Sequence, residues 1–198
     1  CLAGQYANLG LLECVDCELG TYAPVPQTGG CLACGPGLNT NKKEAATQCA
    51  RCEAGTWSGG LAWNCTACTP GQYSASGQSA CASCGAGFYA SQEGSASCTA
   101  CSSGAHAPAT GATSCEACPL GRAQGSSGQD SCASCPSGTF ASAPGSSSCA
   151  RCDVLGPGYT SAEGAIDCGL CRAGYYWAPV VAARQWLHVR GVPREGPL

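Results

Sequence analysis

The residues of this chain best suited to chemistry are its 21 cysteines, all but Cys1 of which stand in C-x-x-C pairs. Paired thiols at this spacing can bind a metal ion, exchange electrons in a redox centre or form disulfides. The pairs recur every 16 to 19 residues, which indicates one small unit repeated along the chain. They lie at Cys14/Cys17, Cys31/Cys34, Cys49/Cys52, Cys65/Cys68, Cys81/Cys84, Cys98/Cys101, Cys115/Cys118, Cys132/Cys135, Cys149/Cys152 and Cys168/Cys171.

Two alternatives to disulfides have to be weighed. A thioredoxin-like redox centre needs a single C-x-x-C at the end of a strand in a βαβ unit, and no such unit is predicted here. Zinc is the stronger alternative, because consecutive pairs 13 residues apart resemble zinc-ribbon spacing. Ten pairs in series would require five stacked zinc sites, and the repeats lack the basic residues typical of nucleic-acid-binding ribbons. We therefore favour disulfides and keep zinc as the alternative.

The periodicity favours a ladder in which the second cysteine of each pair bonds to the first cysteine of the next, with an interleaved connectivity as the alternative. Each bond would close a loop of about 14 to 17 residues, which is worth roughly 3 kcal/mol in the chain-entropy model. Cys171 is left unpaired and could bond to another chain. The expected bonds are Cys1–Cys14, Cys17–Cys31, Cys34–Cys49, Cys52–Cys65, Cys68–Cys81, Cys84–Cys98, Cys101–Cys115, Cys118–Cys132, Cys135–Cys149 and Cys152–Cys168.

The composition explains why such bonds are needed. The 198 residues include only 2 Phe, 4 Trp and 7 Tyr and no Met, against 29 Gly and 12 Pro. A repeat of this size cannot bury a core of its own, and without cross-links so Gly-rich a chain would be disordered. This cysteine content is typical of a disulfide scaffold in an oxidising compartment.

Charge and hydropathy exclude some classes of function. The net charge is -3 and only 11% of the residues are charged, so no basic stripe is available to bind nucleic acid. No apolar run is long enough to span a membrane, and no signal peptide is visible. Because the chain lacks Met and opens on Cys1, the second half of a pair, we expect it to be a processed product or fragment that starts in the middle of the array.

The repeat has a consensus that predicts its local structure. The repeat that begins at Cys68 shows it: Gly71 lies three residues after this cysteine, Tyr73 follows two residues later, and Gly77 precedes the next pair by four residues. The two glycines suit turns with positive φ, and the aromatic side chain can cover the neighbouring disulfide. We expect two short extended segments per repeat, forming a small hairpin, and no helix. The aromatic residue is replaced at Asn39, His106 and Ala123, and Val154–Tyr159 contains a two-residue insertion.

The signature C-x-x-C-x-x-G-x-Y followed by G-x-x-x-C-x-x-C resembles the cysteine-rich repeats of ephrin-receptor-like and growth-factor-receptor-like ectodomains. It is more loosely similar to EGF-like and tumour-necrosis-factor-receptor modules. The resemblance covers residues 1 to about 177 and implies an extracellular, disulfide-rich repeat architecture. It is not specific for a function, since such arrays occur in receptor stalks, adhesion proteins and large secreted structural proteins.

We therefore predict an elongated rod of tandem, disulfide-rich modules of about 17 residues, with short β-hairpins and little other regular structure. Residues 1–171 would form ten closed repeats that mainly touch their neighbours, and 172–198 an unfinished repeat with an atypical tail. In that tail, Val180–Val189 could form a short amphipathic segment that docks to a neighbour, or the tail could be a frayed end or a misread exon boundary.

Few side chains suggest a site outside the cysteines. Asn64-Cys65-Thr66 is the only N-glycosylation sequon, so Asn64 is a possible glycan site, although a cysteine in the middle position can lower the efficiency of modification. His106 stands at an aromatic position and is expected to pack, while His188 lies alone in the tail. We predict no catalytic residues, no cofactor and no metal.

The function that we expect is a non-enzymatic extracellular structural protein. It would be a rod-like subunit or stalk of a cell-surface or ciliary filament, wall or sheath, and a glycoprotein that associates with itself or with other extracellular structural proteins. The alternative is a fragment of a ligand-binding or adhesion receptor ectodomain. That alternative requires exposed aromatic or charged residues on irregular repeats, as around Trp57, Trp63 and Asn64 or at the insertion Val154–Tyr159.

Overall fold

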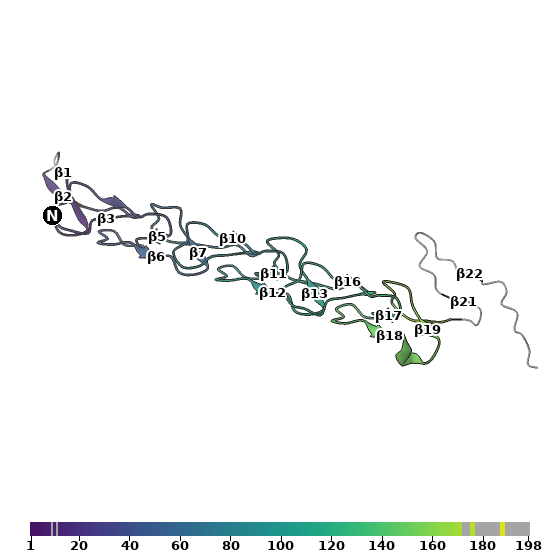
Figure 1. The fold of residues 1–198 in the computed structure, drawn as a ribbon. Coiled ribbons are helices and arrows are strands. Elements are labelled where there is room, and N and C mark those ends of the chain that lie inside the picture. Colours follow the sequence, from purple (N-terminus) through teal and green to yellow (C-terminus); the bar gives the residue numbers. More distant parts are fainter. Residues whose placement is uncertain (9, 11, 172–174, 177–186, 189–198) are drawn as a thin grey trace, which may run out of the picture. The chain divides into compact units, whose positions relative to one another are not determined.

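The computed structural model describes residues 1–8, 10, 12–171, 175–176 and 187–188 (Figure 1). Its regular structure consists of two-stranded antiparallel hairpins, one in each repeat. The paired strands are β1 (Gln5–Asn8) with β2 (Glu13–Asp16), β3 (Thr21–Tyr22) with β4 (Leu32–Ala33), β5 (Leu38–Asn39) with β6 (Ala50–Arg51), β7 (Thr56–Trp57) with β8 (Thr66–Ala67), β9 (Gln72–Tyr73) with β10 (Ala82–Ser83), β11 (Phe88–Tyr89) with β12 (Thr99–Ala100), β13 (Ala105–His106) with β14 (Glu116–Ala117), β15 (Arg122–Ala123) with β16 (Ala133–Ser134), β17 (Thr139–Phe140) with β18 (Ala150–Arg151), and β19 (Tyr159–Thr160) with β20 (Gly169–Leu170).

These hairpins confirm the predicted class of small disulfide-rich repeats. We number them repeat 1 to repeat 10 in chain order. Within the described part of the chain, the expectation that no helix forms is wrong at one place, the 3-10 turn η1 (Cys152–Leu155). This turn takes up the two-residue insertion predicted from the sequence, before the chain enters β19.

Each hairpin is short because its ends are set by backbone turns. In repeat 5, Gly71 has φ 85°, and the N–H of Gln72 donates to the carbonyl oxygen of Thr69 to close the turn before β9. The N–H of Cys84 then donates to the carbonyl oxygen of Gly71 at 2.9 Å, next to the paired residues of β9 and β10. A positive φ at this position strongly favours glycine, so the repeated glycine fixes where each hairpin begins.

Ten disulfides form a ladder, and each closes the loop of one repeat, from the cysteine that opens that repeat to the first cysteine of the following pair. The sequence separations are 13 to 16 residues and the Cα–Cα distances 5.1 to 5.8 Å, within the usual range for disulfides. The bonds are Cys1–Cys14, Cys17–Cys31, Cys34–Cys49, Cys52–Cys65, Cys68–Cys81, Cys84–Cys98, Cys101–Cys115, Cys118–Cys132, Cys135–Cys149 and Cys152–Cys168. Cys171 carries a free, half-buried thiol.

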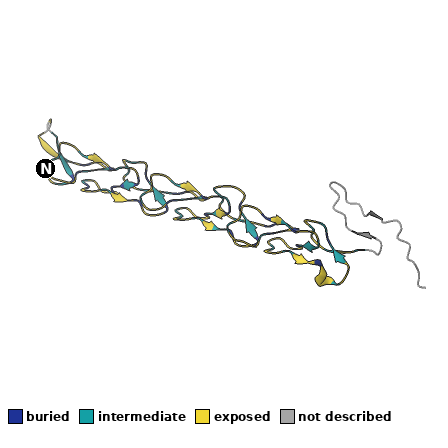
Figure 2. Ribbon diagram, viewed as in Figure 1, coloured by how far each residue is buried: buried dark blue, intermediate teal, exposed yellow. Residues whose placement is uncertain are grey.

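Sulfur and small side chains form the interior. Most of the described chain is exposed or half-buried (Figure 2). The largest fully buried side chains are the cysteines that open repeats 2 to 10, namely Cys17, Cys34, Cys52, Cys68, Cys84, Cys101, Cys118, Cys135 and Cys152. The disulfides therefore occupy the position that branched aliphatic side chains take in an ordinary domain.

The chain divides into two compact units. The first consists of Cys1–Cys101 with Ala107–Cys115, and the second of Ser102–His106 with Glu116–Leu198. Among the described residues, no helix has the length and apolar character needed to cross a membrane.

The predicted tail falls largely outside the described residues, which omit 172–174, 177–186 and 189–198. Two short strands are described there, β21 (Tyr175–Tyr176) and β22 (Leu187–His188), and their backbones pair antiparallel. The predicted amphipathic segment Val180–Val189 lies outside the described residues except for β22. The boundary between array and tail at residue 171 stays a prediction.

Candidate functional site

The backbone contacts between repeats form the most regular feature of the structure, and we call them the inter-repeat seam. Three hydrogen bonds illustrate it in the first unit. The N–H of Gly71 in repeat 5 donates to the carbonyl of Ala90 in repeat 6, at 2.8 Å. The N–H of Ala90 donates to the carbonyl of Ala112 in repeat 7, at 3.1 Å, and the N–H of Gly111 donates back to the carbonyl of Cys84, at 2.7 Å.

In seven of the repeats the seam also reaches the repeat after next. A Cβ on Gly71 of repeat 5 would lie 2.2 Å from the carbonyl oxygen of Gly111 in repeat 7, a distance that Cβ atoms essentially never show. The same relation recurs in both units, at Gly4 with Ala45, Gly20 with Leu61, Gly37 with Gly77, Gly55 with Gly94, Gly104 with Gly145, and Gly121 with Gly164. The inter-repeat hydrogen bonds join adjacent repeats, and this packing contact adds to them because backbones without side chains can approach each other closely.

The residue that supplies this carbonyl lies four residues before the next C-x-x-C pair, and we call it the loop residue. It adopts a positive φ, which is easy for glycine at Gly77 (76°) or Gly111 (74°). Repeats 2, 3 and 4 keep the conformation with side chains that resist it, Gln27 (63°), Ala45 (51°) and Leu61 (52°). The N–H of Leu61 still donates to the carbonyl of Cys34 at 2.8 Å, so the seam holds these residues in a strained conformation.

A third repeated position, directly after the aromatic position, carries a small, buried side chain in most repeats. Ser74 is 2% exposed, and its hydroxyl donates to the carbonyl of Thr56 in the previous repeat at 3.0 Å. Ser58 and Ser161 make the same bond to Leu38 and Thr139. This position was not predicted from the sequence, although small, buried residues recur there at Ala23, Thr40, Ser58, Ser74, Ala90, Ala107, Ala141 and Ser161. Repeat 8 instead carries the larger, half-buried Gln124.

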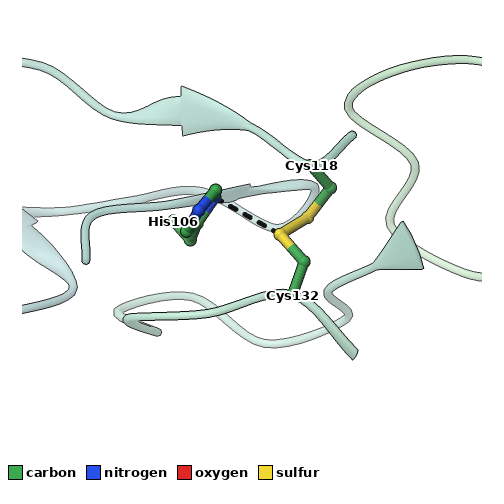
Figure 3. Close-up of side chains that lie close together, drawn as sticks. All are labelled: His106, Cys118 and Cys132. Atoms are coloured by element: carbon green, nitrogen blue, oxygen red, sulfur yellow. Dashed lines mark hydrogen bonds between the residues drawn. A yellow bond between two sulfur atoms is a disulfide. The ribbon is translucent and has the colours of Figure 1, made fainter. Parts of the chain in front are cut away.

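The aromatic position faces the disulfide of the next repeat where it carries a polar residue. His106 of repeat 7 has its Nδ1 atom 3.3 Å from Sγ of Cys132 and 3.2 Å from the carbonyl oxygen of Glu116 (Figure 3). Asn39 of repeat 3 likewise places its amide nitrogen 2.9 Å from Sγ of Cys65. The predicted packing role of His106 is therefore a contact with the Cys118–Cys132 disulfide.

His106, Cys118 and Cys132 also form a group of potential metal ligands, since one ligand atom from each lies within 4.8 Å of the others. The two sulfur atoms are bonded to each other, however, as Figure 3 shows. Cysteine binds zinc as a thiolate, so this pair cannot serve as zinc ligands while the disulfide is intact. The same argument applies to every other cysteine of the ladder, so the zinc alternative requires these disulfides to be reduced.

Repeat 4 carries an exposed apolar surface next to the sequon. The side chains of Leu61 and Trp63 are 63% and 50% exposed, and the ammonium group of Lys42 lies 6.0 Å from the centroid of the Trp63 ring. The N–H of Lys42 donates to the carbonyl of Trp63 at 2.8 Å, which ties this loop to repeat 3. Asn64 and Thr66 of the sequon are both exposed.

The insertion in repeat 10 carries a second exposed surface. Arg151 and Asp153 form an ion pair at its base, with Nε of Arg151 3.0 Å from Oδ1 of Asp153. The hydrogen bond from Arg151 lowers the pKa of Asp153, and the same bond raises the pKa of Arg151. Val154 and Leu155 of η1 lie exposed beside this pair.

Comparison with known proteins adds the following. The family model described as tyrosine-protein kinase ephrin type A/B receptor-like matches residues 4–52, 71–118 and 110–152. Together these segments cover more than half of the chain. They contain eight of the ten hairpins completely, those of repeats 1 to 3 and 5 to 9. No curated protein matches the chain.

Proposed function

We propose that this chain, which belongs to the family of ephrin type A/B receptor-like cysteine-rich repeats, works outside the cell as a non-enzymatic structural module. The family and the ten disulfides indicate an extracellular, receptor-type repeat. Its role in this proposal is that of a stiff spacer, as a stalk or as a subunit of a surface filament, wall or sheath.

The inter-repeat seam is the observation that carries this proposal. Its hydrogen bonds are made by backbone groups and connect a repeat to the next repeat, while close backbone packing connects it to the repeat after that. Bending between two adjacent repeats would have to break the contact that spans them, such as the one between Gly71 and Gly111. A module with this connectivity resists bending although it lacks a large apolar core.

The experiment is a measurement of shape and assembly on the full chain, purified from a secretory host under non-reducing conditions. Small-angle scattering and negative-stain electron microscopy should show an extended particle of constant width, with filaments as concentration rises. A compact globular particle would contradict the spacer. Extended particles that stay monomeric at every concentration would contradict the role as a filament subunit and would be consistent with the role as a stalk.

A ligand-binding or adhesion ectodomain is the second candidate, and the exposed surface of repeat 4 favours it. Leu61 and Trp63 resemble the apolar anchors of an interface, with Lys42 beside them. Affinity capture from extracellular medium tests it with the wild-type chain and with Trp63→Ser, which should lose a partner that binds here. Val154→Ser, on the exposed surface of repeat 10, is the matched control and should keep that partner.

A further inference from the structure

We infer that Asn64 carries an N-linked glycan and that this glycan covers the exposed side chains of Leu61 and Trp63. The inference rests on the secretory location proposed above. It starts from the sequon Asn64-Cys65-Thr66 and gains its support from where the fold puts these residues.

The fold places Asn64 where any side chain points to solvent. The residue directly before the first cysteine of a pair is exposed in all ten repeats, whatever its type: Glu13, Gly30, Gln48, Asn64, Ala80, Ser97, Ser114, Ser131, Ser148 and Asp167. Exposure at this position is thus a property of the repeat and not of asparagine. A large substituent on the Asn64 amide would project away from the seam and leave the hydrogen bonds between repeats in place.

The side chains beside Asn64 give a second, independent reason. Leu61 is 63% exposed and is held at a φ of 52°, which disfavours a branched side chain, while Trp63 is 50% exposed. The equivalent of Leu61 in repeats 5 to 10 is glycine, so the seam itself does not require leucine there. An exposed leucine and tryptophan within three residues of the sequon are explained if a glycan packs over them, because the apolar faces of sugar rings bury such surface.

The transfer step uses the Asn64 amide as the nucleophile. Its nitrogen forms a bond to C1 of the first sugar of an oligosaccharide that is linked through a pyrophosphate to a polyisoprenyl lipid. The bond between C1 and the pyrophosphate oxygen breaks, the lipid pyrophosphate leaves, and the amide loses one proton to solvent. Nothing is oxidised or reduced. In the folded chain the middle residue of the sequon, Cys65, forms a disulfide with Cys52.

The test is to secrete the full chain from a eukaryotic host and to treat it with an amidase that hydrolyses the bond between the asparagine side chain and the N-glycan. Wild type should lose mass in one step, and the peptide that contains Asn64 should then carry aspartate. Asn64→Gln and Thr66→Ala should lack the glycan, while Thr66→Ser, which keeps a sequon, should retain it. A secreted, fully oxidised wild-type chain whose Asn64 peptide is unmodified would overturn this inference but not the proposed extracellular role. A chain that instead stays reduced inside the cell would overturn that role as well.

Whether the glycan covers Trp63 can be tested separately, by tryptophan fluorescence. Release of the glycan should increase the quenching of tryptophan fluorescence by acrylamide, and the increase should be absent in Trp63→Phe, which leaves the sequon intact. An equal increase in both proteins, or none in wild type, would show that the glycan does not lie over Trp63.

Discussion

The α-carbon of Gly71 packs against the carbonyl group of Gly111, forty residues later in the chain, and leaves no room for a side chain. A Cβ at Gly71 would lie 2.2 Å from that oxygen and 2.9 Å from its carbon. Gly71 also has a φ of 85°. Two constraints therefore act on Gly71, the positive φ and the close contact with Gly111. The close contact cannot be relieved by a rotamer change, because both groups belong to the backbone.

Gly71→Ala should therefore destabilise the array more than Gly77→Ala in the same repeat. Gly77 has a φ of 76°, but its Cβ would meet only the Arg51 side chain, at 3.7 Å. We expect Gly77→Ala to cost about 1–2 kcal/mol from backbone strain alone. Gly71→Ala should cost roughly 1–3 kcal/mol more, since the two repeats have to move apart. The measurement is native-state hydrogen exchange at the N–H of Gly111, and equal costs for the two variants would contradict the close contact.

The strained loop residues predict the opposite effect, a gain in stability. Ala45→Gly should remove backbone strain of roughly 1–2 kcal/mol, offset by about 0.4–1 kcal/mol of extra entropy in the unfolded chain. The net gain is seen as a higher denaturation midpoint under non-reducing conditions. Ala75→Gly is the control, because Ala75 is exposed and does not have a positive φ. It should lower the midpoint, and a gain in both variants would point to a general effect of glycine.

The hairpins could be predicted from the sequence because the residues that bound them recur at fixed spacing. These residues are the cysteines and the glycine equivalent to Gly71. The sequence did not predict which backbone that glycine meets, since the partner is set by the pitch of the array and lies two repeats away. The positive φ at Ala45 and Leu61 could not be predicted from the sequence for a related reason. Neither residue is a glycine, and contacts between repeats impose the conformation. Neither residue type favours it on its own.

The candidate site could likewise be predicted from the sequence only in part. The sequon at Asn64 could be found from the sequence, but its exposure and its position beside Leu61 and Trp63 required the fold. His106 could be assigned a packing role because it replaces an aromatic residue. Its contact with the sulfur of Cys132 could not, because the aromatic position faces the disulfide of the next repeat.

The buried serines should contribute to stability through their hydroxyl groups. Ser74→Ala removes the donor to the carbonyl of Thr56 and should cost about 0.5–1.5 kcal/mol, the usual net value of such a bond. Alanine fits the position sterically, as Ala90 shows one repeat later. Ser79→Ala, at an exposed serine of the same repeat, should leave the denaturation midpoint unchanged. If Ser74→Ala were equally silent, the hydroxyl bond would not contribute to the seam.

The ion pair of repeat 10 should show a small dependence on acid. Because the pKa of Asp153 is lowered in the folded chain, its contribution to stability is present above the pKa of an unfolded aspartate and is lost as the pH falls through the lowered value. Both side chains are exposed, so the effect on stability should be slight and should weaken with salt. An NMR titration of the Asp153 carboxyl should move to higher pH in Arg151→Gln. An unchanged titration would mean that the pair does not form in solution.

The disulfide ladder makes the most demanding prediction. Peptide mapping without reduction should find the ten second-to-first bonds and one free thiol at Cys171. Removing one bond with Cys68→Ser and Cys81→Ser should cost about 3 kcal/mol. Because the seam reaches two repeats in either direction, hydrogen exchange should accelerate around repeat 5 while repeat 10 keeps its protection. Global loss of protection would mean that the array unfolds as one cooperative body. No loss at all would show that packing, not sulfur, holds the repeats together.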